Sequence, residues 1–398
     1  MLRFKDNHGL DFPNLKKTTL GEVCNKIGDG LHSAPIYDVN GEYYFINGNN
    51  LKDGVIIITP DTKKVSKKTF LKNDKKLDDR TILLSINGTI GNLAYYKNEN
   101  VMLGKSAAYL KIKESVDKKY IYQLLQTRKV KISFLLSLTG TTIKNLGLES
   151  INKTHIFIPV LDEQHKIADF LSSVDDVIQI QEEKITALEE QKKGIMQKLF
   201  NREVRFKADD GSEYPEWERK NIGSACVVNP KTEKLENEFY YIDLGSVDKG
   251  NLVLDSTILK DDAPSRAQRV LSLDDVIFQS VRPYNMGHYH YTYLMDKQVV
   301  ASTGFIQLRL KDGLNAYLYQ LLYTSHFNNE VDIRCTGSNY PAINSDSLAE
   351  IGIDLPCNEE QKKIVDCLSA YDEAIQIKKE KLEIWKEIKR GLLQQMFA

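Results

Sequence analysis

The chain has 398 residues, of which 41% are hydrophobic and 27% are charged, and its net charge is −1. No apolar run is long enough to span a bilayer, and the first residues lack the apolar core of a signal peptide, so we expect a cytoplasmic protein without membrane partners. The five cysteines form no closely spaced pair and are odd in number, which argues against a disulfide framework and predicts reduced thiols.

Charge is distributed unevenly along the chain. Residues 1–160 carry a net charge of +10, residues 161–204 carry −4, residues 205–357 carry −7 and residues 358–398 carry none. A basic first part fits a protein that contacts nucleic-acid phosphates. A solvated lysine-rich surface fits the same counts, so charge alone does not decide between the two.

Residues 1–160 are expected to form a domain of short strands and helix. Runs of β-branched and aromatic residues predict strands at 55–59, 81–86 and 107–112, and the segment 120–130 is predicted to be helical. Turn signals that contain glycine separate these segments. The pattern predicts an α+β domain.

A long helix is predicted to follow, over residues 161–204. Apolar side chains recur there at alternating intervals of four and three residues, which is the spacing of a heptad seam. The members assigned to helix pairing are Ile167, Leu171, Val174, Ile178, Ile185 and Leu188. Gln181 and Lys192 also fall in the seam, and a polar residue at such a place favours one register over others.

The remainder of the chain repeats the first part. The segment Arg3-Phe4-Lys5 returns as Arg205-Phe206-Lys207, and Tyr120-Ile121-Tyr122-Gln123 returns as Tyr317-Leu318-Tyr319-Gln320. Further matches follow in the same order, so the chain is a duplication. Residues 205–357 are therefore predicted to form a second α+β domain.

A second seam helix is predicted over residues 358–398. Its pairing members are Ile364, Leu368, Tyr371, Ile375, Leu382 and Trp385, and Lys378 and Lys389 occupy the two places that are polar in the first seam. Because a duplication implies approximate two-fold symmetry, we expect the two helices to pack antiparallel and the two chain ends to lie near each other. The alternative is that each helix binds a partner protein instead.

This organisation resembles the specificity subunit of a type I restriction–modification enzyme over the whole chain. The resemblance is carried in the first half by Gly28-Asp29-Gly30-Leu31-His32, by Ile82-Leu83-Leu84-Ser85 before Gly88-Thr89-Ile90-Gly91, by Thr139-Gly140-Thr141-Thr142 and by Glu163-Gln164. The second half keeps Thr336-Gly337-Ser338 and Glu360-Gln361, lacks the Asp-Gly-x-His segment, and has Val281-Arg282-Pro283-Tyr284 where the first has Ile86-Asn87-Gly88-Thr89. Each motif is weak alone, but their order, found twice, is specific.

The resemblance implies the architecture and the partners. Residues 1–160 and 205–357 would be target-recognition domains that each read one half of a split double-stranded DNA target, while the helices at 161–204 and 358–398 set the gap between the halves. Two methyltransferase subunits, which modify adenine with S-adenosylmethionine, and two restriction and translocase subunits are the implied protein partners. Cofactors (S-adenosylmethionine, ATP and Mg) are expected on those partners, with none on this chain, which is expected not to be an enzyme.

Candidate DNA-binding residues of the first domain fall into two groups. Polar side chains on loops that match the family pattern are the expected readers of base edges. They are His32, Asn47, Asn49, Asn87, Thr89, Thr141, Thr142 and Lys144. The lysine run, of which Lys63, Lys64, Lys67 and Lys68 are the selected members, is expected to contact phosphates, unless it is an ordinary solvated surface.

The second domain offers fewer candidates. They are Gln279, Arg282, Tyr284, Ser338, Asn339 and Tyr340, and Arg282 is the strongest because arginine pairs bidentately with guanine. The acidic balance of this domain predicts that the methyltransferase subunits supply most of the phosphate contacts there. The alternative is that its own positive residues cluster on one face.

Two rival functions remain open from the sequence. One is a coiled-coil adaptor that reads no DNA. The other is a metal-dependent nuclease, because Asp61 and the later Asp74-Lys75-Lys76 resemble a metal-binding pattern. His288-Tyr289-His290 lacks a nearby third ligand, so no metal site is predicted and a strand with both rings on one face is expected instead. The sequence contains no Walker A pattern and no Asn-Pro-Pro motif of the kind adenine methyltransferases require.

Overall fold

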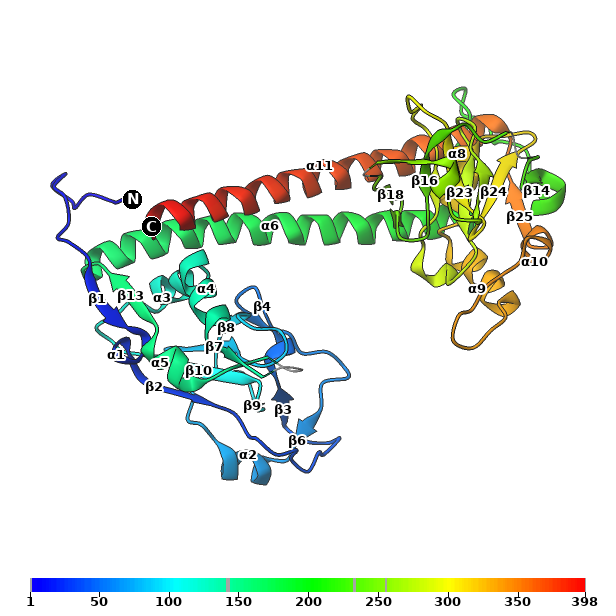
Figure 1. Ribbon diagram of the computed structural model, residues 1–398. Coiled ribbons are helices and arrows are strands. Elements are labelled where there is room, and N and C mark those ends of the chain that lie inside the picture. The colour runs from blue at the N-terminus through cyan, green and yellow to red at the C-terminus, as the bar shows by residue number, and fades with distance from the viewer. Residues whose placement is uncertain (1, 141–143, 232–233, 255, 398) are drawn as a thin grey trace. The chain divides into compact units, whose positions relative to one another are not determined.

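The computed structural model describes residues 2–140, 144–231, 234–254 and 256–397, and the chain divides into two compact units (Figure 1). The first unit consists of residues 1–182 and 380–398, and the second consists of residues 183–379. Each unit holds one globular domain together with parts of two long helices. The predicted α+β class is confirmed in both domains.

The domain of the first unit is built on two small sheets. The larger, in the order β2-β10-β7-β8, is antiparallel, and the smaller, in the order β6-β3-β9, pairs β3 with β9 in parallel. Their strands are β2 (Cys24–Asp29), β10 (Ala107–Ile112), β7 (Thr81–Ser85), β8 (Leu93–Tyr95), β6 (Lys64–Val65), β3 (Tyr43–Ile46) and β9 (Val101–Leu103). Three two-stranded pairs complete the domain: β1 (Lys16–Thr19) with β13 (His155–Ile158), β4 (Leu51–Lys52) with β5 (Val55–Ile56), and β11 (Leu138–Thr139) with β12 (Asn145–Leu146).

Short helices surround these sheets. They are α1 (Leu20–Val23), η1 (Gly48–Asn50), α2 (Lys67–Asn73), α3 (Lys118–Leu125), α4 (Arg128–Leu136) and α5 (Leu148–Lys153). The strands predicted at 81–86 and 107–112 are confirmed, whereas only Val55–Ile56 of the strand predicted at 55–59 is formed. The helical segment predicted at 120–130 is formed by parts of two helices, α3 and α4, because the Thr127 hydroxyl between them donates to Leu124 O and accepts from Val130 N.

The domain of the second unit repeats this plan. The sheet β15-β24-β21-β22 corresponds to the larger sheet, and β19-β16-β23-β20 corresponds to the smaller one, again with one parallel pair, β16 with β23. The strands are β15 (Cys226–Val228), β24 (Phe305–Leu310), β21 (Val276–Gln279), β22 (Tyr289–His290), β19 (Thr257–Leu259), β16 (Glu238–Ile242), β23 (Val299–Ser302) and β20 (Ala267–Val270), with the pairs β14 (Glu218–Asn221) with β25 (Gly352–Leu355) and β17 (Val247–Asp248) with β18 (Asn251–Leu252). Its helices are α7 (Ile222–Ala225), η2 (Lys260–Asp262), η3 (Pro283–Asn285), α8 (Asn315–Leu321), α9 (Ser325–Arg334) and α10 (Ser345–Ala349).

Two long helices, α6 (Leu161–Phe200) and α11 (Asn358–Met396), follow the two domains in the chain. In the first unit Lys386 Nζ lies 3.1 Å from Glu182 Oε1, and in the second Lys379 Nζ lies 2.9 Å from Glu189 Oε1. Lys389 also pairs with Asp175 in the first unit, and Lys192 with Asp372 in the second. Within each unit the residue number on α11 therefore falls as the number on α6 rises, so the two helices run antiparallel there, as predicted.

Burial along the two helices follows the heptad seam. The buried members are Ile167, Leu171, Val174, Ile185, Ile364, Leu368, Ile375 and Leu382, and the half-buried ones are Ile178, Leu188, Tyr371 and Trp385. Among the described residues, the buried side-chain oxygen of Gln181 has no hydrogen-bond partner. The side-chain oxygen of Gln181 therefore makes no contact that would select one helix register. Lys192, at the other polar position of this seam, does: its Nζ lies 2.7 Å from Asp372 Oδ1 of α11.

Each domain core takes in residues from both long helices. In the first unit Ile167 and Leu171 of α6 join Leu393 and Met396 of α11 in one buried cluster. The corresponding cluster of the second unit takes Met196 and Leu199 from α6 and Ile364 and Leu368 from α11. Because these side chains are almost fully buried, the helix ends are part of the domain cores.

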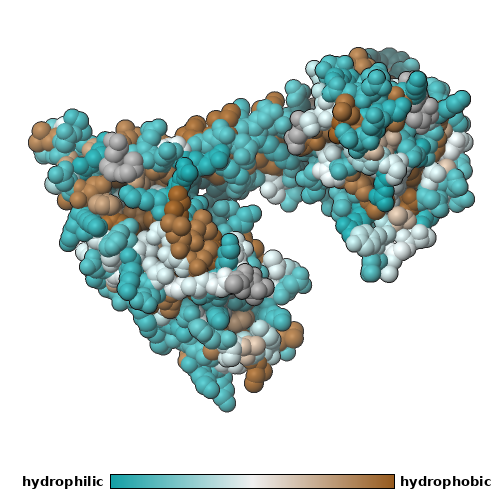
Figure 2. All heavy atoms as spheres, viewed as in Figure 1, coloured by the Kyte–Doolittle hydropathy of each residue, from teal (hydrophilic) through white to brown (hydrophobic). Residues whose placement is uncertain are grey.

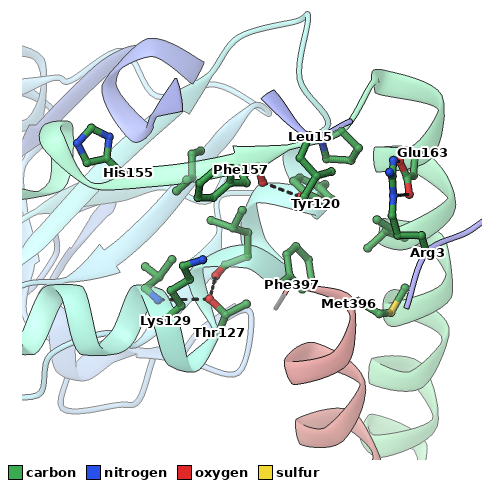
Figure 3. A pocket seen from close by; sticks show the side chains of 15 residues that line it. Arg3, Leu15, Tyr120, Thr127, Lys129, His155, Phe157, Glu163, Met396 and Phe397 are labelled. Atoms are coloured by element: carbon green, nitrogen blue, oxygen red, sulfur yellow. Dashed lines mark hydrogen bonds and ion pairs between the residues drawn. The ribbon is translucent and has the colours of Figure 1, made fainter. Parts of the chain in front are cut away.

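An arginine clamp fastens the segment before each domain to the start of a long helix. Arg3 Nη2 lies 2.5 Å from Glu163 Oε2, and Arg205 Nη2 lies 2.8 Å from Glu360 Oε2, with both glutamates fully buried (Figure 3). Leu2 N also donates to Gln395 O at 2.8 Å, which confirms that the chain ends lie near each other.

The clamp of the first unit borders a small cavity. Tyr120, Phe157 and Phe397 line it, and the Tyr120 hydroxyl donates to Phe157 O at 3.2 Å (Figure 3). Its volume is about 30 Å³, whereas ligand pockets usually have about 300–1,000 Å³. We therefore regard this place as a packing junction.

Candidate nucleic-acid interface

The end of β7 in the first domain brings several predicted readers together. Beyond Ser85 the chain forms a loop, residues 86–92, that lies against the hairpin β11–β12. Leu146 N donates to Ile86 O at 2.9 Å, and the backbone of Asn87 forms an isolated antiparallel β-bridge with that of Asn145. Thr89 and Lys144 are exposed on these two segments. Thr141 and Thr142, also predicted readers, lie outside the described residues. We call this arrangement the loop–hairpin pair of the first domain.

A second group of predicted readers lies beside the same strand end. Ile86 N donates to Ser106 O, and the Ser106 hydroxyl in turn donates to Asn47 Oδ1 at 2.9 Å. Asn49, in η1, is exposed. The structure therefore places Asn49 close to the loop–hairpin pair.

Asn47 has a structural role that the sequence did not reveal. Its side chain is half-buried, accepts from Ser106 and caps η1 in a reciprocal arrangement with Asn50. A side-chain β-carbon at Gly104 would overlap Asn47 Oδ1, so glycine is needed at this contact. Because Ser106 engages only the amide oxygen, the role of Asn47 as a reader of a base stays a prediction.

His32 is accessible on the loop after β2. Its side chain is 63% exposed, and Nε2 lies 2.7 Å from Asp29 Oδ2. The segment before it is held close to the loop–hairpin side of the domain, because Leu31 N donates to Leu103 O and Leu31 bridges to Gly104. The predicted reader His32 therefore lies at the same end of the domain as Asn49.

The lysine run lies along the smaller sheet. Lys63 Nζ is 4.4 Å from the ring centre of Tyr37, and Lys64 Nζ is 5.1 Å from that of Tyr44 on β3. Lys67 and Lys68 are exposed at the start of α2. Stacking on aromatic rings holds the first two ammonium groups in place.

The second domain repeats the loop–hairpin pair. Ile343 N donates to Ser280 O at 3.0 Å, and Val281 bridges to Ala342, as Leu146 and Asn87 do in the first domain. Val281 therefore corresponds to Asn87. The sequence match of Arg282 with Asn87 is thus off by one residue, because the loops differ in length while the strand ends coincide.

Arg282 stands at the centre of this second loop–hairpin pair. Its backbone has φ 52°, a left-handed conformation that non-glycine residues adopt rarely. Arg282 N donates to Pro341 O at 2.7 Å, and the guanidinium lies 4.3 Å from the ring centre of Tyr340. Among the described residues the buried Nε of Arg282 has no hydrogen-bond partner. The arginine is thus held in one place by packing and backbone bonds.

Exposed side chains surround Arg282. Tyr284 is 56% exposed and Tyr340 is 66% exposed, and Ser338 and Asn339 on the hairpin are exposed as well. The loop–hairpin pair thus presents an arginine, two aromatic rings and short polar side chains to solvent. Such side chains can donate to base edges and pack against them.

Gln279 is a correction to the predicted site. It is 3% exposed, its Nε2 donates to Val281 O at 2.8 Å, and its Oε1 accepts from Gly287 N at 2.9 Å. Both ends of the amide are engaged, so Gln279 shapes the loop that carries Arg282 and does not reach a base. No sequence signal distinguished this role from reading.

The residues behind the rival metal-site hypotheses have structural roles. Asp74 pairs with Lys76 at 3.0 Å, and the backbone N of Lys76 also donates to it. His288 is fully buried against Phe278, its Nδ1 accepts from Gln279 N, and burial lowers the pKa of His288 to about 3. No group of three potential metal ligands occurs in the part of the chain that the structure describes.

A groove of about 770 Å³ lies in the second unit between the end of α6 and the start of α9. Lys192, Lys193, Arg202 and Arg219 line it, and of these only Arg219 belongs to residues 205–357. Arg219 is paired with a carboxylate, Asp354. The clustering of positive charge in this domain is therefore modest.

An exposed apolar face was not predicted. On α4, Ile132 is 43%, Leu135 59% and Leu136 84% exposed, and Figure 2 shows an apolar patch over this helix on an otherwise mainly hydrophilic face. Ile333 on α9, the counterpart of Leu136, is 76% exposed. Both helices lead directly into the hairpin of a loop–hairpin pair, and exposed apolar patches commonly mark protein contacts.

Both repeats match one known class of domain. The sequence model described as "Type I restriction modification DNA specificity domain" matches residues 14–190 and again residues 216–386. Two DNA specificity domains in tandem are thus the class that this fold represents. Since the matches cover most of the chain, it belongs to the family of type I restriction–modification specificity subunits.

Individual relatives agree with this family. The chain is 27% identical over 410 aligned positions to the type I restriction enzyme MjaVIII specificity subunit of Methanocaldococcus jannaschii, covering 98% of this chain and 94% of that protein. The S subunit of a type I system from M. genitalium matches its fold with a TM-score of 0.59 at 18% identity, over 100% of this chain and 98% of that one. A chain solved in work on complex assembly in the type I R-M system matches with a TM-score of 0.54 at 15% identity, covering 98% and 99%.

No helix in the described ranges is both long enough and apolar enough to cross a membrane.

Proposed function

We propose that this specificity subunit reads a split DNA target through its two loop–hairpin pairs and carries no catalytic centre of its own. The observation that carries the proposal is the repetition: both domains hold a loop against a hairpin by the same backbone bonds, yet the side chains presented differ. A common scaffold with different readers fits two half-targets of different sequence. Helices α6 and α11 would set the gap between the half-targets.

In the second domain, Arg282 is the proposed reader of a guanine. Arginine donates two hydrogen bonds to guanine O6 and N7, worth about 1–3 kcal/mol of discrimination against another base. Stacking on Tyr340 restricts the guanidinium before DNA arrives, so less conformational entropy is lost on binding.

In the first domain, the proposed readers are His32, Asn47, Asn49, Asn87, Thr89 and Lys144, together with Thr141 and Thr142, which lie outside the described residues. Lys63, Lys64, Lys67 and Lys68 are proposed to contact phosphates. Because these are charge contacts without sequence information, their loss should weaken binding to all sequences alike.

The remaining components are proposed as partners. Two methyltransferase subunits would bring S-adenosylmethionine, and two restriction and translocase subunits would bring ATP and Mg. The exposed apolar face of α4 supports the presence of a protein partner beside the first loop–hairpin pair, whereas α9 has one exposed apolar side chain, Ile333. The acidic second domain leads us to propose that the methyltransferases supply most phosphate contacts there, so the isolated chain should bind DNA weakly.

The test is single-molecule sequencing of modified adenines in cells that express this chain with its methyltransferase partner. A split motif that is methylated only when the chain is present is the expected result. Arg282→Ala should then relax the motif at one position of one half-target and leave the other half unchanged. An active partner that methylates no new motif would instead favour the adaptor hypothesis, and metal-dependent DNA cleavage by the purified chain would favour the nuclease.

A further inference from the structure

The loop after β2 carries the two most exposed large apolar side chains of the described residues. Val39 is 92% exposed and Ile36 is 85% exposed, and Tyr37 between them is 40% exposed. We call Ile36 and Val39 the apolar tip of this loop, which leads from His32 to β3. Exposed apolar side chains that gather in one segment usually mark a binding surface, whereas scattered single ones do not.

The loop is tied to the domain on both sides of Ile36. Leu31 N donates to Leu103 O of β9 at 2.8 Å, and Asp38 N donates to Lys64 O of β6 at 2.9 Å. Since β9 and β6 are the two outer strands of the smaller sheet, the loop crosses this sheet from one edge to the other. Pro35 also restricts the backbone just before the tip. A loop held in this way loses little conformational entropy when it binds.

Positive charge surrounds the apolar tip. Lys63 Nζ lies 4.4 Å from the ring centre of Tyr37, and that ring packs edge-on against Phe45 at 5.9 Å between ring centres. Lys64, whose carbonyl group holds the loop, belongs to the same lysine run. Apolar side chains beside fixed ammonium groups suit DNA, which offers phosphates at the rims of a groove and bases inside it.

The plan of the recognition domain does not require such a tip. In the second domain residues 229–237 connect β15 to β16, as residues 30–42 connect β2 to β3. Among the described residues of that connection, 229–231 and 234–237, Leu235 is the only large apolar one, and it packs against a buried cluster. The second domain therefore folds without exposed apolar side chains here, which indicates that the tip of the first domain serves binding.

The chemistry of the tip selects one feature of DNA. Ile36 and Val39 are short and stiff because both branch at the β-carbon, so they reach the edge of a groove more readily than the space between stacked bases. The apolar group that DNA presents in its major groove is the C5 methyl of thymine. Ile36 follows His32 by four residues, a reach of at most about 14 Å, which is the length of about four base pairs.

We propose that Ile36 and Val39 pack against thymine methyl groups in the major groove of the half-target that the first domain reads. The inference rests on the proposed function and names a base that this domain selects. Cytosine has no C5 methyl and presents an N4 amino donor in the major groove, which an apolar side chain leaves without an acceptor. The two residues thus determine specificity for thymine over cytosine.

The test uses the full chain assembled with its methyltransferase partner and synthetic duplexes of the split target. Each thymine is replaced in turn by deoxyuridine, which lacks only the methyl group. At a thymine that meets the tip, the wild type should lose about fourfold in methylation rate at low DNA concentration. That thymine should lie in the half-target that Arg282→Ala leaves unchanged. Ile36→Ser/Val39→Ser should fold, because both side chains are exposed, and should methylate the two duplexes at equal rates.

Leu10→Ser is the matched control. Leu10 is 65% exposed in the same unit but lies outside the loop, so this variant should keep the sensitivity of the wild type to deoxyuridine. Equal wild-type rates on all duplexes, or a sensitivity that persists in the tip variant, would overturn the inference. Failure of the tip variant to assemble with the methyltransferase in the absence of DNA, measured by size-exclusion chromatography, would also overturn it, because the tip would then be a protein surface.

The same experiment separates the inference from the proposed function. If the wild type methylates no split target, the proposed function fails and the inference falls with it. If the wild type methylates a split target but responds to none of the thymine methyl groups, the proposed function stands and only the inference is wrong.

Discussion

Breaking the arginine clamp of the second unit should strongly destabilise that unit alone. In Arg205→Met the Glu360 carboxylate, which is fully buried, loses its two bonds to the guanidinium and, among the described residues, keeps one donor, Trp217 Nε1, at 2.9 Å. Removing one partner of a buried ion pair costs about 3–5 kcal/mol. Because Arg205 is 20% exposed, we expect the lower end, about 3 kcal/mol.

Urea denaturation followed by tryptophan fluorescence measures this effect. The chain has two tryptophans, so a Trp385→Phe background leaves Trp217, which touches the clamp, as the sole reporter. With a slope of about 2 kcal/mol per M urea, the midpoint should fall by about 1.5 M. Arg205→Met/Glu360→Gln should recover most of this loss, because no buried charge remains and the amide oxygen still accepts from Trp217.

The control is Arg219→Met, which removes a pair with Asp354 in the same unit. Arg219 is 55% exposed, so the cost should stay below about 1 kcal/mol. A midpoint for Arg205→Met that stays within the range of this control would refute the reasoning, since it would mean that Glu360 tolerates burial without its guanidinium.

Three further predictions concern single residues. Arg282→Lys keeps the charge but loses the bidentate geometry, so base discrimination at one position of the methylated motif should fall by about 1–3 kcal/mol with overall binding little changed; equal loss on every sequence would identify a phosphate contact instead. Because the folded pKa of His288 is lowered to about 3, the unfolded state binds the proton first. Stability should fall as pH drops below about 6.5, by up to ~1.4 kcal/mol per unit, and urea midpoints of His288→Phe should lack this part of the slope. Burial raises the pKa of Cys24 and Cys226 to about 12, so iodoacetamide at pH 8 should label half-buried Cys357 first. Mass spectrometry should find label on Cys24 and Cys226 only after unfolding, and early labelling of either would contradict their burial.

The helices and strands that could be predicted from the sequence are those whose apolar side chains recur at regular intervals or form one continuous run. The heptad spacing of α6 and α11 fixed their extent to within a few residues, and the repeat implied their antiparallel pairing. The strand β7 was recognisable because its side chains are buried on both faces and its centre, Ile82-Leu83-Leu84, is an apolar run. The interruption between α3 and α4 at Thr127 was missed because threonine can also occur within a continuous helix. Only the hydrogen bonds of its hydroxyl, to Leu124 O and from Val130 N, show that Thr127 caps the start of α4.

The candidate site was harder to predict because it lies on loops, where apolar and polar residues follow no regular spacing. Arg282 and Tyr340 were both chosen from the sequence, but their stacking depends on a bridge between Val281 and Ala342 that joins distant segments. Gln279 looks like a reader in the sequence, because an amide suits both a base edge and a backbone bond. Burial separates the two uses, and burial follows from tertiary packing.

The division of the first unit has a consequence during synthesis. Its core is completed by Leu393 and Met396, which lie on the last turns of α11, while the rest of the unit ends at residue 182. At about 5–20 residues per second, a ribosome needs about 10 to 40 s to add the intervening second unit. During that time the apolar face of Ile167 and Leu171 lacks its partners from α11. A nascent chain that stops early would keep this face uncovered, so truncated products should be recognised by chaperones and proteases before they can join a complex.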